Sequence, residues 1–140
     1  MLKSKLIIDK DEKIQVTVYL GVDKKQNLLG SYDKKKLLDM SELETSEAEL
    51  LEVNFTFRRP SYRDDINIIS ESVSQKLDST GESYSINPAT IRYSRFIQLF
   101  EDWDLTDDEG KKVEPTQDSI DKLHPVLANS ALEGLEENLS

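Results

Sequence analysis

The stretch LLEVNFTFRRPSYRDDINII, residues 50–69, decides the fold class because its hydrophobic period changes half-way along. Up to residue 58, apolar and polar residues alternate, as in a half-buried strand. One face of this strand carries Leu51, Val53, Phe55 and Phe57. Pro60 ends the strand, because proline cannot donate to a sheet ladder. Beyond it, apolar residues recur at spacings of three and four, which indicates an amphipathic helix.

The part before this stretch contains a second alternating run, KIQVTVYL at residues 13–20, which ends at Gly21. The segment LIID, residues 6–9, is predicted to be its hairpin partner, with a turn at residues 10–12. About three strands are therefore expected before residue 60. That is close to the minimum for a sheet that is stable by itself.

Residues 22–49 show weaker patterns. Asp33 is predicted to cap a short helix over KKKLLDM, residues 34–40. SELETSEAE, residues 41–49, has no apolar face and is expected to be a surface loop.

The part after Pro60 begins with a helix predicted over SYRDDINIISESVSQKL, residues 61–77, with Ser61 as its N-cap. DSTGES then breaks the chain at Gly81. The buried face of the helix is predicted to consist of Ile66, Ile69, Val73 and Leu77.

A second long helix is predicted from Asn87-Pro88 to residue 103, because asparagine caps helices and proline suits the first helical position. Trp103, the only tryptophan, lies at the end of its apolar stripe. We expect it to be buried between this helix and the last one, the alternative being an exposed anchor for a partner. A short helix from Thr116 and a leucine-rich helix from Pro125 follow.

These elements predict an α+β fold, with an N-terminal antiparallel sheet of three to four strands followed by about four helices. The length of 140 residues suits a single domain, residues 1–140. Within it, residues 1–60 are expected to form a strand-rich part and residues 61–140 an acidic helical part.

The net charge of −10 comes entirely from the second part, where residues 61–140 hold 7 basic and 17 acidic side chains. An acidic surface repels phosphate backbones, so nucleic acid is not an expected partner. The excess charge serves solubility, or forms a docking face for a basic partner. No apolar run approaches the ~20 residues that span a bilayer, and the N-terminal apolar run is too short for a signal peptide. A soluble, cytoplasmic protein is expected.

No pattern for catalysis or for a cofactor is present. The chain has no cysteine and a single histidine, His124, next to Pro125 at a helix junction. The acidic loop around Gly110 does not fit a calcium-binding EF-hand loop. With Gly110 at position 6, Leu105 takes position 1, which needs an oxygen ligand, and Thr116 takes position 12, which needs a bidentate glutamate. We therefore predict a protein without catalytic residues, cofactor or metal.

Two groups of charged residues are candidates for partner binding. Arg58 and Arg59 follow a strand directly, and either recognise a partner or neutralise the acidic C-terminal half. Asp107, Asp108 and Glu109 lie together before Gly110, where they form either a docking face or a solvated turn.

The last half of the chain resembles tail assembly chaperones of tailed bacteriophages. The resemblance rests on Phe100-x-x-Trp103-Asp104-Leu105 at a helix end, the acidic turn at residues 107–111, and Thr116-x-x-x-Ile120-x-x-Leu123-His124-Pro125-Val126 before a leucine-rich helix. The junction at residues 57–61 is also similar.

The resemblance implies a protein of the host cytoplasm, without catalysis or cofactor, that binds a phage structural protein such as the tape measure. One alternative is a structural subunit of the tail, baseplate or neck that stays in the virion. A third reading, from charge alone, is an acidic DNA mimic that inhibits a host nuclease.

Overall fold

The computed structural model describes residues 5–9, 11–78 and 81–139, and the side chains of these ranges except residues 73–86. The chain divides into two compact units, each built from two segments. Unit 1 comprises Met1–Glu12 and Arg58–Phe100, and unit 2 comprises Lys13–Phe57 and Glu101–Ser140. The units thus interleave along the sequence, and neither corresponds to residues 1–60 or 61–140.

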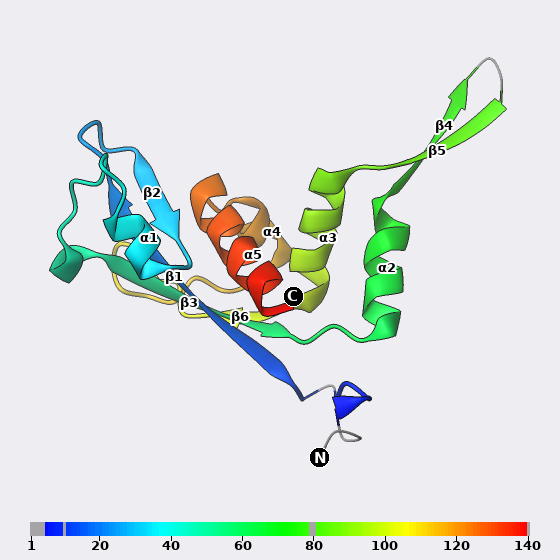
Figure 1. Cartoon of the computed structure of the whole chain (residues 1–140), viewed down its shortest axis with the longest axis horizontal. Helices are drawn as coiled ribbons and strands as arrows, with labels where there is room; N and C mark the ends of the chain where they lie inside the picture. Colours follow the sequence, from blue (N-terminus) through cyan, green and yellow to red (C-terminus); the bar gives the residue numbers. More distant parts are fainter. Residues whose placement is uncertain (1–4, 10, 79–80, 140) are drawn as a thin grey trace. The chain divides into compact units, whose positions relative to one another are not determined.

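A four-stranded antiparallel sheet with the order β2-β1-β3-β6 is the main element of the fold (Figure 1). Its strands are β1 (Lys13–Val22), β2 (Leu28–Ser31), β3 (Leu51–Arg58) and β6 (Phe100–Trp103). The two alternating runs of the sequence form β1 and β3, as predicted. The α+β class and the sheet size are confirmed, although the fourth strand comes from the second half of the chain.

One face of the sheet forms the core of unit 2. Its side chains are at most 5% exposed: Ile14, Val16, Val18, Leu20, Val53, Phe55 and Phe57. Helix α5 (Pro125–Leu139) packs on β1 and β2 at this face. The approach is close at Gly134, where an added Cβ would lie 2.5 Å from Cγ1 of Val16. Two periods of hydrophobicity therefore meet at one interface, period two from the sheet and period 3.6 from the helix.

The shorter helices of unit 2 begin at their predicted caps. The Asp33 side chain accepts hydrogen bonds from the first amides of α1 (Lys34–Leu38). The Thr116 side chain does the same for Ser119 in α4 (Gln117–Asp121). The predicted loop at residues 41–49 contains a short 3-10 helix, η2 (Glu47–Glu49).

Unit 1 is built on two helices, α2 (Tyr62–Ser72) and α3 (Pro88–Leu99), that pack against each other. An antiparallel hairpin of β4 (Val73–Asp78) and β5 (Gly81–Ile86) joins them. Figure 1 shows this hairpin extending from one end of the helix pair. The start of α3 is as predicted, since the Asn87 side chain accepts a hydrogen bond from Ala89 N (2.9 Å) and Pro88 occupies the first turn.

The N-terminal prediction was wrong. Residues 6–9 do not form a strand, and Leu6 and Ile7 are 73% and 80% exposed. The partners of β1 are β2, with Tyr19 opposite Ser31, and β3. The strand order β2-β1-β3-β6 therefore has no place for residues 6–9, and the exposure of Leu6 and Ile7 shows that their apolar side chains find no buried face here.

The first long helix is shorter than predicted, and it buries a different face. It ends at Ser72, and the next residues form β4. Ile66 and Ile69 are 41% and 49% exposed, whereas Asp64, Ile68 and Ser72 are buried. These three residues follow each other at a spacing of four, so they line one side of the helix. The predicted positions Val73 and Leu77 lie outside the described side chains.

The second long helix also ends early, at Leu99, and residues 100–103 form the edge strand β6. Trp103 is buried as predicted, at 2% exposure, but in a strand and not at a helix end. Its ring stands edge-on to Phe55, with 6.1 Å between the ring centroids. Burial of the indole and hydrogen bonding to β3 both favour the strand. The main-chain amide of Asp104 donates to the main-chain oxygen of Asn54 at 3.1 Å.

Candidate functional site

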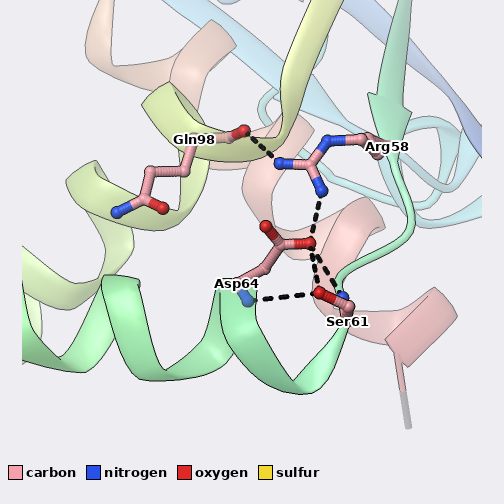
Figure 2. Close-up of polar contacts among 4 residues, drawn as sticks. All are labelled: Arg58, Ser61, Asp64 and Gln98. Atoms are coloured by element: carbon pink, nitrogen blue, oxygen red, sulfur yellow. Dashed lines mark hydrogen bonds and ion pairs between the residues drawn. The ribbon is translucent and has the colours of Figure 1, made fainter. Parts of the chain in front are cut away.

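Arg58 lies at the end of β3 and connects the two helices of unit 1 (Figure 2). One Nη atom pairs with Oδ2 of Asp64 in the first turn of α2. The other donates to the main-chain oxygen of Gln98, 3.1 Å away, in the last turn of α3. A guanidinium carries several donors in a fixed plane, so it can hold a carboxylate and a carbonyl together.

Ser61 and Asp64 form a reciprocal cap at the start of α2 (Figure 2). The amide of Ser61 donates to Oδ2 of Asp64 at 2.8 Å, and the amide of Asp64 donates to Oγ of Ser61 at 3.3 Å. This is the geometry of a capping box, with aspartate in place of the usual glutamate. The hydrogen bond from Arg58, together with those from Ser61, lowers the pKa of Asp64 below its ordinary value, although burial acts in the opposite direction.

Arg59 is paired as well. Its Nε lies 3.6 Å from Oε2 of Glu12, and its main-chain amide donates to the main-chain oxygen of Glu12 at 3.0 Å. Both predicted arginines therefore engage acceptors inside unit 1. As a partner-binding pair they would first have to exchange these contacts for new ones.

The acidic turn, residues 107–110, is organised by Asp107. Its Oδ1 accepts hydrogen bonds from the amides of Glu109 (2.9 Å) and Lys111 (3.0 Å). Gly110 has a φ of 78°, a left-handed conformation that favours glycine. Asp108 and Glu109 are exposed. The five predicted binding residues thus form two separate groups, the arginines in unit 1 and the acids in unit 2.

An open hollow of about 380 Å³ lies beside β6 in unit 2. Its polar groups are mutually paired: Asn54 Nδ2 donates to Asp104 Oδ2 (2.7 Å) and Lys112 Nζ to Asp102 Oδ1 (2.9 Å). The hydrogen bond from Lys112 lowers the pKa of Asp102, and the same bond raises the pKa of Lys112. The hollow therefore offers few unpaired polar groups to a ligand.

His124 acts as a cap, because its Nδ1 accepts a hydrogen bond from the amide of Val126 (3.1 Å) at the start of α5. Within the described residues no three His, Cys, Asp or Glu side chains are grouped closely enough to hold a metal ion. The same residues include no helix that is long and apolar enough to cross a membrane.

Charge and exposed apolar surface are divided unequally between the units. Unit 1 has 9 basic and 8 acidic residues, whereas unit 2 has 9 basic and 20 acidic residues. Eight large hydrophobic side chains are exposed among those that the structure describes, and six of them belong to unit 1: Leu6, Ile7, Tyr62, Ile66, Ile69 and Tyr93. Among its described residues, unit 2 exposes only Met40 and Leu51 in this way.

Three of these side chains, Tyr62, Ile66 and Ile69, follow the spacing i, i+4, i+7 on α2, and we call them the α2 stripe. The sequence predicts a buried face that includes Ile66 and Ile69 but not Tyr62, and the structure exposes all three. The signal for the other side of the helix is Arg58, which precedes Ser61-x-x-Asp64 in the sequence. Asp64 caps the helix and pairs with Arg58, so the side of α2 that carries Asp64 is the buried one.

Comparison with known proteins gives no assignment: no family model, no curated protein and no solved structure matches this chain.

Proposed function

We propose that this protein is a non-catalytic binding protein of bacteriophage tail assembly, which holds another phage structural protein, such as the tape measure, before assembly. The observation that carries the proposal is the division between the units. Unit 1 is nearly neutral and exposes apolar side chains, while unit 2 carries 20 acidic residues and few exposed apolar ones. A holding protein needs both properties, since apolar surface binds a partner and net charge opposes aggregation.

The order of elements in the second half gives partial support. An acidic turn, a short helix from Thr116 and a final helix from Pro125 occur where the resemblance to tail assembly chaperones implies them. The helix that should end in Trp103 is the exception, because it ends at Leu99. The proposal therefore rests more on the surfaces than on this pattern.

Co-expression with the tape-measure protein of the same phage genome tests the proposal. We expect the tape measure to remain in the supernatant and to copurify with the chain, and to precipitate when expressed alone. Unchanged precipitation in the presence of the chain would contradict the proposal.

Mass spectrometry of purified virions separates an assembly factor from the alternative, a structural subunit. An assembly factor should be absent from the particles. A stoichiometric amount in each particle would instead identify a structural subunit.

A further inference from the structure

The α2 stripe forms the exposed apolar side of a three-turn helix. Tyr62 is 81% exposed, Ile66 41% and Ile69 49%. Their spacing corresponds to successive d, a and d positions of a heptad, the spacing at which one helix packs along another. The other side of α2, which carries Asp64, Ile68 and Ser72, is buried. Helix α2 thus has one buried side and one exposed apolar side. Water now covers the stripe, at an energetic cost that a partner surface would remove.

Two exposed charges of opposite sign flank the stripe. Arg63 and Asp65 occupy the e and g positions of the same heptad, where coiled coils form ion pairs between helices. Among the described residues neither side chain forms an ion pair, in contrast to Arg58 and Arg59. These charges can therefore select a partner and orient it.

A second copy of the chain does not satisfy these charges. In an antiparallel pair of α2 helices, e positions meet e positions and g positions meet g positions, so Arg63 would face Arg63 or Ser70 of the other copy. In a parallel pair, Asp65 at g would face Ser70 at e. Neither arrangement gives Arg63 or Asp65 an opposite charge within α2, and two chains of net charge −10 repel each other.

We propose that the α2 stripe is the docking face for an amphipathic helix of a different protein. This helix has apolar residues at a and d, a basic residue on the flank next to Asp65, and an acidic residue on the flank next to Arg63. This inference rests on the proposed function, for which it supplies the binding surface and the chemistry of the partner segment. The chain recognises this partner helix by apolar contact along the stripe and by one ion pair on each side of it.

Two synthetic helices of about 21 residues, three heptads, serve as probes for the full-length chain. Both have leucine at a and d. The mixed probe has lysine on one flank and glutamate on the other, while the acidic probe has glutamate on both. Amide shifts in NMR spectra locate each probe, and titration calorimetry gives its affinity.

We expect the wild-type chain to bind the mixed probe several-fold more tightly than the acidic probe, with the largest shifts in residues 62–72. In Asp65→Lys both flanks of α2 are basic, so the preference should reverse. Ile69→Asp should weaken both probes by about tenfold or more, the effect of losing an apolar interface side chain. Because Ile69 is half-exposed, this variant should keep the circular dichroism spectrum of the wild type.

Three results would overturn the proposal: undetectable binding of both probes, shifts outside α2, or a preference that Asp65→Lys leaves unchanged. A wild-type dimer in light scattering that Ile69→Asp converts to a monomer would assign the stripe to a second copy. The tape-measure experiment remains independent of these outcomes. If Ile69→Asp still holds the tape measure in solution, the docking face is wrong and the proposed function stands.

Discussion

The indole nitrogen of Trp103 donates a hydrogen bond to the main-chain oxygen of Val113, 2.7 Å away. Through this bond the edge strand β6 is tied to the segment that follows the acidic turn. The same indole packs edge-on against Phe55 of β3. Trp103 therefore stabilises both the edge of the sheet and the loop that returns from it.

Replacing Trp103 with alanine should lower the free energy of unfolding by about 3–5 kcal/mol, because a large buried aromatic side chain is removed. Trp103→Phe is the matched control, since it keeps an apolar ring beside Phe55 but has no donor for Val113. We expect it to lose roughly 1–3 kcal/mol. Urea unfolding followed by far-ultraviolet circular dichroism gives both values, and an alanine variant as stable as the wild type would contradict the observed burial.

Asp64→Asn should remove a pH-dependent part of the stability. The pKa of Asp64 is lowered in the folded state by the hydrogen bond from Arg58, whereas in the unfolded chain it is about 3.9. The unfolded state therefore binds the proton first, so this contribution is present above pH ~4 and disappears as the pH falls through the folded pKa.

At neutral pH Asp64→Asn should be less stable by about 1.5–3 kcal/mol, the usual range for a hydrogen bond to a charged group. The difference from the wild type should shrink as the pH falls below about 4. Asp65→Asn, one residue further along the helix, is exposed and is the matched control for the loss of one negative charge. A constant difference for Asp64→Asn over this fall in pH would show that the ion pair contributes nothing.

Gly134→Ala should destabilise the protein, although alanine is the better helix former by about 1 kcal/mol. The new Cβ would lie 2.5 Å from Cγ1 of Val16 and 2.9 Å from Cβ of Tyr32. Overpacking of this kind costs about 1–3 kcal/mol. Glu133→Ala, on the exposed side of the same helix, should change stability by less than about 0.5 kcal/mol. Thermal melts of the two variants give the comparison, and a Gly134→Ala variant that is more stable than the wild type would contradict the close approach.

Variants of the acidic turn separate a structural role from a binding role. Asp107→Ala removes the acceptor of two amide hydrogen bonds and should cost about 1 kcal/mol or more. Asp108→Asn and Glu109→Gln should leave stability within about 0.5 kcal/mol of the wild type. If these two acids dock a basic partner, their neutral variants should weaken its binding, most clearly at low salt. A loss of stability in the neutral variants would assign these residues to the turn itself.

The elements that could be predicted from the sequence are those whose local signals agree with their surroundings. Alternation defines β1 and β3 because one side of each strand is buried and the other is not. Asp33, Asn87 and Thr116 mark helix starts because each side chain satisfies amides that the helix leaves free. Such signals lie within a few residues of the element that they define.

The sequence-based predictions were wrong where the local pattern of apolar residues fits more than one structure. Phe100 and Trp103 continue the apolar stripe of α3 at helical spacing, yet they form a strand because β3 offers hydrogen bonds beside them. No local pattern reports that neighbour. The same holds for α2, whose buried side is set by Arg58 and α3 and not by its most apolar residues.

The strands β3 and β6 are neighbours in the sheet, although the chain leaves the first at Arg58 and joins the second at Phe100. Helix α2, the hairpin and helix α3 thus form one long excursion at the site of a simple β-hairpin turn. Closing a longer loop costs only about 0.6 kcal/mol for each doubling of its length. Over evolution this excursion can therefore grow, shrink or be exchanged without disturbing the sheet, whereas a single residue inserted within β1 would turn its apolar side chains to the opposite face. Homologues should accordingly differ in length between residues 58 and 100 and keep a fixed length within β1 and β3.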